Sequence, residues 1–383
     1  MLITESERLK DFAPGKRLWQ GIPGVCGTKN GRLFATFYSG GVTEEYGNYT
    51  LLLISDDGGA SFRDPVAVHY PDDPAAMRVF DPCVWIDPEG RLWWFAARAD
   101  ITPGHRSCRV IAYVCDDPDA KEIVFGKEIT VADGIMMNKP TVTKDGRLLL
   151  PVAVWAANVA GLRPLNATFP FDRIDRGAFV YESRDGGATF TKRGGVDMPD
   201  RSFDEHMIVE KKDGTLAMFV RRHDGIGTSV STDGGATWSE GVDSGLGGPD
   251  ARFFIRRLAS GRLLLVNYAA SGRARKNLAA MLSDDDGRTW SAPLMLDERA
   301  NVSYPDGFED ENGNITVIYD HERGAYKTCA ADALAEAREI LLCRFTEADI
   351  LAGKIIGDGS FLRKTVSKLS DYDGDADALY QNR

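Results

Sequence analysis

The chain has 383 residues, of which 43% are hydrophobic and 27% are charged, so a disordered or low-complexity protein is excluded. Its 57 acidic and 46 basic residues give a net charge of −11, which repels polyanions and argues against nucleic-acid binding. The N-terminus has no cationic start with an apolar run, and no 18 consecutive residues are apolar. We therefore expect no membrane segment and a cytoplasmic protein, or a secreted one if a leader was removed.

The cysteines and histidines show no metal-site spacing. The six cysteines are scattered without a C-x-x-C pair, which is typical of reduced thiols rather than of a disulfide frame or a zinc site. The five histidines form no H-E-x-x-H or similar motif. The sequence therefore predicts neither a metal nor a cofactor.

A short turn recurs six times along the chain, in the form x-Gly-x-Leu or x-Gly-x-Ile followed by an apolar run. Its glycines are Gly31, Gly90, Gly146, Gly214, Gly261 and Gly313, which are 59, 56, 68, 47 and 52 residues apart. A strand-like segment precedes each turn, so each copy predicts a hairpin whose glycine adopts a positive φ.

A second motif, Ser-x-Asp-x-Gly-x-x-aromatic, follows four of these hairpins. Its copies are Ser55–Phe62, Ser183–Phe190, Ser231–Trp238 and Ser283–Trp290. The Asp can cap the backbone N–H groups of a turn and the aromatic can fill space between sheets, so we expect a purely structural turn between the third and fourth strands of each repeat. Six four-stranded repeats predict an all-β fold, a six-bladed β-propeller.

We expect one domain that spans residues 1–383. The main insertion is 158–177, and 355–383 is a C-terminal tail. The segments at the two ends of the chain, 1–17 and 355–383, are expected to supply a closing strand and the tail.

The repeat also predicts which side chains surround the axis. Nine residues before each glycine, at the start of each innermost strand, stand Ile22, Asp81, Met137, Glu205, Arg252 and Tyr304. Seven or eight residues after the glycines, at the same end of the blades, stand Tyr38, Ser39, Arg98, Arg221, Arg222, Tyr268, Asp320 and His321.

Such a gathering of Arg, Asp, Glu and Tyr at one mouth of a channel suits an acidic sugar. Guanidinium groups bind a carboxylate, carboxylates move protons, and a hydroxyl serves as nucleophile. The alternative interpretation is a web of ion pairs that fills the axis, with Arg252 and Asp81 as its first candidates.

With these residues the chain resembles the sialidase (neuraminidase) superfamily, in particular bacterial sialidase-like BNR-repeat proteins. The resemblance implies a Tyr nucleophile assisted by a Glu, an acid/base Asp on a loop, and three arginines on the substrate carboxylate. Tyr304, in Ser-Tyr-Pro-Asp, resembles the nucleophile, and Glu205, in Asp-Glu-His, resembles the assisting residue. Arg221 and Arg275 resemble two of the arginines, and Arg222 replaces Arg221 if the register shifts by one.

Two positions depart from the family pattern. The chain has Gln20-Gly21-Ile22-Pro23 where sialidases have Arg-Ile-Pro, so one arginine is missing, and Arg98, Arg78 or Lys139 are the candidates to replace it. The acid/base loop, 43–48, contains no Asp. Glu45 or Glu44 can serve as the acid there, or both are solvated loop charges.

The leading hypothesis is an exo-acting glycoside hydrolase that retains configuration through a tyrosyl intermediate, with a small-molecule glycoside as its partner. The predicted catalytic residues are Tyr304, Glu205 and Glu45. The predicted substrate-binding residues are Arg221, Arg275, Arg98, Arg252, Asp81 and Lys139. The alternatives are a glycosidase for another nonulosonic acid, a uronate or a neutral sugar, and a propeller that binds glycans without hydrolysing them. The sequence leaves the oligomeric state open.

Overall fold

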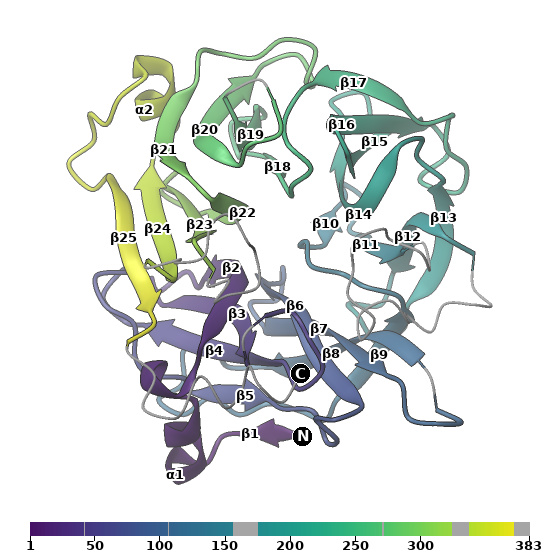
Figure 1. The fold of residues 1–383 in the computed structure, drawn as a ribbon. Helices are drawn as coiled ribbons and strands as arrows, with labels where there is room; N and C mark the ends of the chain where they lie inside the picture. Colours follow the sequence, from purple (N-terminus) through teal and green to yellow (C-terminus); the bar gives the residue numbers. More distant parts are fainter. Residues whose placement is uncertain (42, 106, 156–174, 270–271, 324–336, 371–383) are drawn as a thin grey trace.

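The fold is a ring of six antiparallel sheets around a central axis (Figure 1). The computed structural model describes residues 1–41, 43–105, 107–155, 175–269, 272–323 and 337–370. The prediction of an all-β, six-bladed β-propeller is confirmed. Most of the expected insertion, 158–177, lies outside the described residues.

The first three blades follow the chain in order. Blade one contains β2 (Trp19–Gly27), β3 (Leu33–Gly40), β4 (Tyr49–Ser55) and β5 (Ala67–His69), with β1 (Leu2–Ile3) added outside β5. Blade two contains β6 (Met77–Ile86), β7 (Leu92–Asp100), β8 (Ser107–Cys115) and β9 (Ile129–Asp133). Blade three contains β10 (Thr141–Val142), β11 (Leu148–Val154), β12 (Gly177–Ser183) and β13 (Thr191–Val196).

The other three blades complete the ring. Blade four contains β14 (Arg201–Glu210), β15 (Leu216–Arg222), β16 (Gly225–Ser231) and β17 (Val242–Leu246). Blade five contains β18 (Phe254–Arg257), β19 (Leu263–Tyr268), β20 (Lys276–Ser283) and β21 (Leu294–Ala300). Blade six contains β22 (Val302–Glu309), β23 (Ile315–His321), β24 (Glu339–Phe345) and β25 (Phe361–Lys368). The short helices are α1 (Ser6–Leu9), the 3-10 turns Lys10–Phe12 and Pro14–Lys16, and α2 (Glu347–Ala352).

The two repeated motifs form the expected turns. The six hairpin glycines have φ between +76° and +88°, a region that is strained for residues with a Cβ. In the first Ser-x-Asp box, which joins the third strand of blade one to the fourth, Asp57 accepts hydrogen bonds from the Ser55 hydroxyl (2.7 Å) and from the Ser61 backbone N–H (2.9 Å). The other three boxes repeat this pattern, so the boxes hold turns at the outer ends of the blades.

Among the described residues, no strand is shared between blades. Each described blade comes from one continuous stretch of chain: β1 extends the outer edge of blade one, and β25, within the expected tail, is the outer strand of blade six. Hydrogen bonds join blades one and six instead. The backbone N–H of Ile22 donates to Asp320 (2.8 Å), and the Gln20 side chain donates to the Arg338 carbonyl (2.8 Å).

Four of the innermost strands carry a β-bulge at the position that the repeat had singled out. The register shifts in β2, β6, β14 and β22, and Ile22, Asp81, Glu205 and Tyr304 have φ of 57°, 48°, 43° and 56°. Positive φ is strained for non-glycine residues and collects at functional sites. A bulge also re-aims a side chain.

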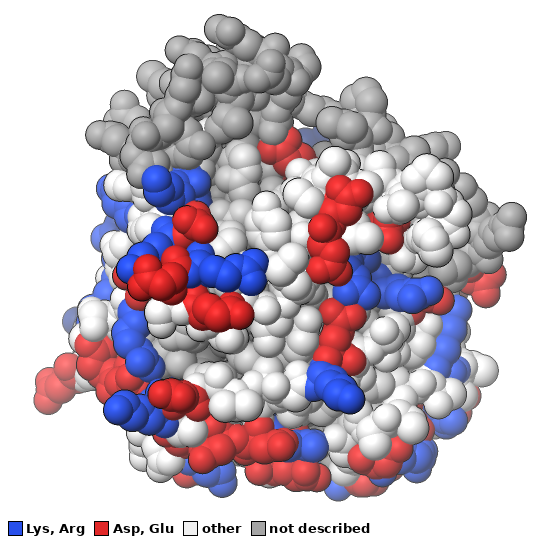
Figure 2. Space-filling model, turned by 90° about the horizontal axis from the view of Figure 1, so that it is seen from below, with Lys and Arg blue, Asp and Glu red and all other residues white. Residues whose placement is uncertain are grey.

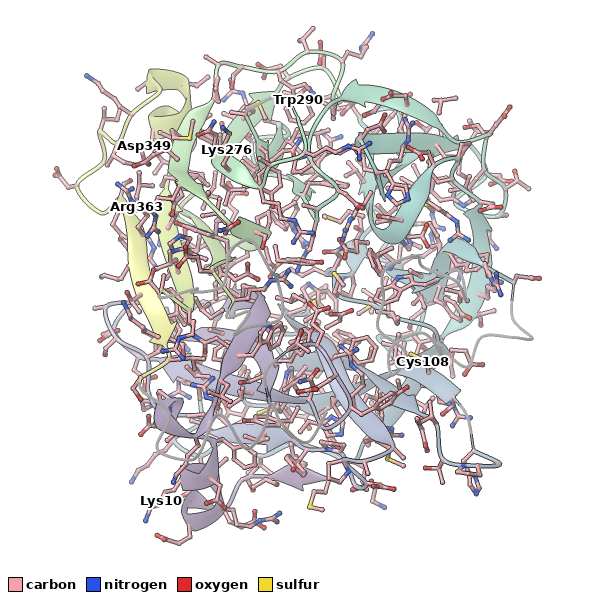
Figure 3. All side chains as sticks on the ribbon, in the orientation of Figure 1. Lys10, Cys108, Lys276, Trp290, Asp349 and Arg363 are labelled. Carbon is pink, nitrogen blue, oxygen red and sulfur yellow. The ribbon has the colours of Figure 1, made fainter. Side chains whose placement is uncertain are left out.

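Apolar side chains fill the spaces between neighbouring blades, and many polar atoms lie near the axis (Figure 3). Seen from below, where α1 and β1 lie, acidic and basic side chains are interspersed rather than gathered by sign (Figure 2). Among the described residues, no helix has the length and apolarity needed to cross a bilayer.

Asp306 is the point where four blades meet at the axis. Its carboxylate, in blade six, accepts a hydrogen bond from the Val25 backbone N–H of blade one (2.9 Å) and one from the Lys139 ammonium near blade three. The Arg252 guanidinium, near blade five, lies 3.3 Å from it. The three ionic side chains are at most 2% exposed, so each charge depends on its partners for solvation.

Replacing Asp306 by alanine is expected to destabilise the fold by about 3–5 kcal/mol, because two buried cations lose their counter-charge. Equilibrium unfolding in urea measures the change. Asp358→Ala, which removes an exposed carboxylate, is the control and should stay close to wild type. Equal unfolding midpoints for the two variants would show that Asp306 does not hold the axis together.

Candidate active site

One mouth of the channel holds a cavity, and the repeat positions converge on it. Five of the six residues that stand nine places before the turn glycines line this cavity: Ile22, Asp81, Met137, Glu205 and Tyr304. The sixth, Arg252, lies deeper in the axis against Asp306. The bulged inner strands therefore deliver side chains from blades one, two, four and six to one place.

Tyr304, Glu205 and Arg221 form the centre of the cavity. The Tyr304 hydroxyl lies 3.3 Å from Glu205 Oε1, and the same oxygen accepts a hydrogen bond from Arg221 Nη1 at 2.6 Å. Arg221 Nη1 is also 3.2 Å from the Tyr304 oxygen. Tyr304 and Glu205 are 6% and 4% exposed, so this contact is shielded from water. The arrangement places a base beside a phenol and a cation beside both.

Asp250 fixes the arginines on one side of the cavity. It accepts a hydrogen bond from Arg221 Nε through its carboxylate (2.7 Å) and from Arg221 Nη2 through its backbone oxygen (3.0 Å). The backbone oxygen also accepts from Arg275 Nη2 (2.8 Å). Arg221 is therefore largely occupied by protein groups, whereas Arg275 makes this one hydrogen bond among the described residues.

The pKa of the Tyr304 phenol is raised. Burial raises it most and the Glu205 carboxylate adds to this, while the guanidiniums of Arg221, Arg275 and Arg323 act in the opposite direction. Tyr304 is therefore a protonated phenol in the resting protein. Its proton has to leave as the oxygen forms a bond, and Glu205 is the group positioned to accept it.

Arg323 is a cavity residue that the sequence reasoning missed. Its guanidinium carbon lies 4.9 Å from the centre of the Tyr304 ring, and Arg275 lies at 5.3 Å from the same ring. Arg323 follows β23 and reaches the cavity across Gly21. A Cβ at position 21 would lie 2.3 Å from the Arg323 Cδ, so only glycine leaves room for this side chain.

Arg323 lies just beyond the positions at which the repeat predicts cavity residues. Residues seven or eight places after Gly313 are Asp320 and His321, whereas Arg323 is ten places after it. Gly21 also pointed to such a residue. It stands where the family has an arginine, and the space left by the missing side chain is filled by Arg323.

The acidic loop places Glu44, rather than Glu45, in the cavity. Glu44 accepts a hydrogen bond from Arg323 Nη1 (2.7 Å). Burial would raise the pKa of Glu44, but Arg323 and Arg78 outweigh burial and the pKa is lowered. Glu45 is buried, its backbone N–H donates a hydrogen bond to Asn48 Oδ1 (2.6 Å), and it does not line the cavity. The expected role of Glu45 therefore has no geometric support.

The pKa of Asp81, another cavity carboxyl group, is raised rather than lowered. Asp81 is 2% exposed, and burial raises its pKa well above the ordinary value, helped by the negative charges of Glu44 and Glu205 against the opposing effect of Arg78. A raised pKa favours the protonated form of this carboxyl group, which can donate a proton.

Three aromatic side chains, Phe80, Trp155 and Phe203, also line the cavity. Trp155 packs against Phe203 with ring centres 4.9 Å apart and lies near Phe80 at 6.5 Å. Arg78 stacks on Phe80 at 4.0 Å. Arg221 lies over the Phe203 ring at 4.8 Å, so guanidinium groups and aromatic rings are packed together in the cavity lining.

Several predicted residues do not reach the cavity. Arg98 pairs with Glu128 (2.8 Å), and Arg222 pairs with carboxylates of blade four. Both stand eight places after their turn glycine, whereas Arg221 stands seven after its own. Successive side chains of a strand point to opposite faces, so this difference of one residue turns Arg98 and Arg222 away.

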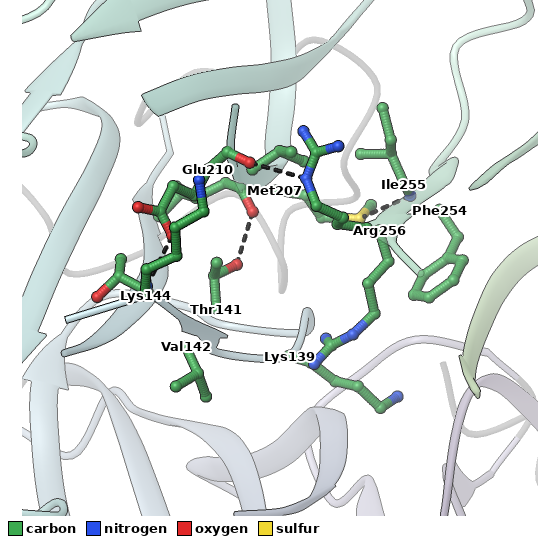
Figure 4. Close-up of a pocket in the computed structure, with 13 residues that line it drawn as sticks. Lys139, Thr141, Val142, Lys144, Met207, Glu210, Phe254, Ile255 and Arg256 are labelled. Atoms are coloured by element: carbon green, nitrogen blue, oxygen red, sulfur yellow. Dashed lines mark hydrogen bonds between the residues drawn. The ribbon is translucent and has the colours of Figure 1, made fainter. Parts of the chain in front are cut away.

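Lys139 and Arg252 are also outside the cavity, because both contact Asp306 in the channel. Lys139 in addition lines a second pocket at the side of blades three, four and five (Figure 4). Among the candidates to replace the missing arginine, only Arg78 lines the cavity, together with the unpredicted Arg323.

Similar solved structures are propellers of the same kind. The Hadza microbial sialidase Hz136 is 18% identical with a TM-score of 0.63, and the match covers 80% of this chain but 64% of that one, slightly under two thirds. The intramolecular trans-sialidase from Ruminococcus gnavus is 14% identical with a TM-score of 0.63, covering 90% and 97%. The Penicillium chrysogenum alpha-L-arabinanase is 14% identical with a TM-score of 0.51, covering 79% and 89%.

At such identities these likenesses establish the fold alone, since one fold hosts several functions. No curated protein matches the chain. The family model described as a BNR repeat-like domain matches residues 73–317, which is more than half of the chain. This match shows that the chain belongs to the family of BNR repeat-like domains, and the six blades and the four Ser-x-Asp boxes agree with it.

Proposed function

We propose that the protein is an exo-acting glycoside hydrolase that removes a terminal acidic sugar, sialic acid or a relative, with retention of configuration. The observation that carries this proposal is the buried contact between the Tyr304 hydroxyl and Glu205 inside a cavity rich in arginine. A phenol beside a carboxylate is the arrangement of a nucleophile and its base.

The charges of the cavity favour an acidic substrate over a neutral one. Four guanidiniums line it, from Arg78, Arg221, Arg275 and Arg323, against three carboxyl groups, of which Asp81 tends to stay protonated. Among the residues that the structure describes, Arg275 donates one hydrogen bond, through Nη2, and Arg323 donates one side-chain hydrogen bond, through Nη1, which leaves their other guanidinium nitrogens to a ligand. These two arginines are the best placed to bind a substrate carboxylate, as guanidinium groups do.

A neutral nucleophile suits such a substrate. A carboxylate would repel the anionic sugar, whereas the phenol of Tyr304 approaches without charge. In the first step the Tyr304 oxygen bonds to the anomeric carbon, the glycosidic C–O bond breaks, and the phenolic proton passes to Glu205. Arg221, hydrogen-bonded to both groups, keeps them in position.

Asp81 is the proposed proton donor to the leaving oxygen. It lines the same cavity and its raised pKa favours the protonated form, whereas Glu44, whose pKa is lowered, is bound to Arg323. After the aglycone leaves, the Asp81 carboxylate takes a proton from water, whose oxygen bonds to the anomeric carbon. Tyr304 departs with the proton held by Glu205, which restores the starting state.

Tyr304→Phe is expected to lower kcat by about 10³-fold or more, because the nucleophilic oxygen is removed, while the fold and the affinity for an acidic sugar are kept. Hydrolysis of chromogenic sialic acid, deaminated sialic acid, glucuronate and rhamnose glycosides measures the loss. Tyr113→Phe, in the outer part of blade two, is the matched control and should keep wild-type activity. Unchanged turnover in Tyr304→Phe would refute the assignment, and binding without hydrolysis by the wild type would indicate a lectin-like protein.

Asp81→Asn tests the proton donor. We expect kcat/KM to fall by about 10²–10⁴-fold for alkyl glycosides, whose leaving oxygen needs a proton, and to change little for nitrophenyl glycosides. In the wild type, activity on alkyl glycosides should fall as pH rises through the elevated pKa of Asp81, because the ionised form cannot donate. Glu44→Gln is the comparison, and an equal loss for both leaving groups in Asp81→Asn would exclude Asp81 as the acid.

Gly21→Ala tests the route of Arg323 into the cavity. The added methyl group displaces the Arg323 stem, so KM for an acidic glycoside should rise about tenfold, as it should in Arg323→Met, with a smaller effect on kcat. Gly247→Ala, which meets no atom within 4 Å, is the control. If Arg323 does not contact the substrate, both variants will retain the wild-type KM.

A further inference from the structure

Three cationic side chains gather around one carboxylate inside the channel, away from the Tyr304 cavity. Lys139 and Arg252 both contact Asp306. Arg256 lies close enough for Asp306 to favour its charged form, yet burial has the larger effect and lowers the pKa of Arg256. The described residues therefore leave the axis with an excess of positive charge.

The hydrogen-bond donors of these cations are incompletely satisfied. Arg252 is fully buried and makes one side-chain hydrogen bond, to the Pro23 carbonyl at 3.4 Å, while its Nε and Nη2 atoms have no hydrogen-bond partner. Arg256 donates no side-chain hydrogen bond to any described residue. Buried donors without partners and buried charges without counter-ions are both costly.

Neighbouring carboxylates correct the imbalance only in part: the Glu309 charge favours the charged form of Arg256, but no carboxylate besides Asp306 contacts the cluster directly among the described residues. Glu210 accepts from the Lys144 backbone N–H (2.7 Å), and Glu309 accepts from that of Ala259 (2.6 Å). Burial raises the pKa of Glu309, which weakens its negative charge. Neither group hydrogen-bonds to Arg252 or Arg256.

A pocket gives access to this cluster from outside. It is lined by Lys139 and Arg256, by Thr141, and by the apolar side chains of Val142, Met207 and Phe254. Figure 4 shows the Arg256 side chain extending across the pocket toward Lys139. None of its lining residues belongs to the Tyr304 cavity, so the two hollows are separate.

We propose that this pocket is a binding site for a small oxyanion, such as inorganic phosphate, held by Arg256 and Lys139. The planar guanidinium group presents parallel N–H donors that match two oxygens of such an anion, and the ammonium of Lys139 has further donors besides the one that Asp306 accepts. Arg252 adds positive charge from the interior. The anion balances the axis of the propeller, and the site is independent of the proposed hydrolysis.

Thermal unfolding of the full chain in a phosphate titration tests the site, with ionic strength held constant by sodium chloride. We expect the Tm of the wild type to rise with phosphate and to saturate, because a ligand that binds only the folded state stabilises it. In Arg256→Met the apparent Kd should weaken by at least about tenfold, as expected for a lost charge-assisted pair. Arg288→Met, which removes an exposed arginine, should respond as the wild type does.

The change in Tm that Arg256→Met causes in the absence of phosphate distinguishes a binding role of Arg256 from a structural one. There, Arg256→Met should melt at or above the Tm of the wild type, because it removes a half-buried cation whose guanidinium hydrogen-bonds to no described residue, and the order should reverse at saturating phosphate. Arg256→Lys keeps the positive charge but loses the paired guanidinium donors, so it should bind phosphate with intermediate affinity. This variant tests whether Arg256 binds phosphate if the methionine variant does not fold. A wild-type response that is absent, unsaturable or equal in Arg256→Met would overturn the proposal.

Discussion

The ionic contacts of Asp306 are the constraint on which the propeller and its cavity both depend. Among the described residues no strand is shared between blades, and this carboxylate, the Lys139 and Arg252 charges and the Val25 backbone bring four blades together at the axis. Asp306 also lies two residues after Tyr304 on the same bulged strand. Whatever fixes Asp306 at the axis therefore fixes the direction in which the Tyr304 phenol points.

The bulges show how a repetitive scaffold produces a site that is not repetitive. Each inner strand reaches the same mouth of the channel, and in four of them the backbone takes a positive φ at the corresponding residue. Such strain persists only where the surroundings over-determine it. The same β-bulge occurs in these strands with a different residue each time. It therefore places the phenol of Tyr304, the base Glu205 and the carboxyl group of Asp81 at the mouth. The residue type at each bulge determines the chemistry of the cavity, and the fold determines where that side chain lies.

The fold and half of the cavity could be predicted from sequence because both follow from periodicity. The turn glycines fixed the blades, and counting back nine residues found Tyr304, Glu205 and Asp81. Counting forward was less reliable, since strand side chains alternate and an error of one residue sends Arg98 to the opposite face. Arg323 and Glu44 lie beyond regular strands, where no period applies. The protonated state of Asp81 depends on burial and on neighbouring carboxylates that only the folded chain assembles.

Charge in this protein is segregated between its outside and its axis. The chain carries a net charge of −11, yet the cavity and the channel concentrate Arg78, Arg221, Arg275 and Arg323 at one end and Lys139, Arg252 and Arg256 toward the other. A small anion is repelled by the bulk of the molecule and attracted at the axis, where low-dielectric walls strengthen the local field. The net charge argues against nucleic-acid binding, while the arginines of the Tyr304 cavity and of the Arg256 pocket favour small acidic ligands.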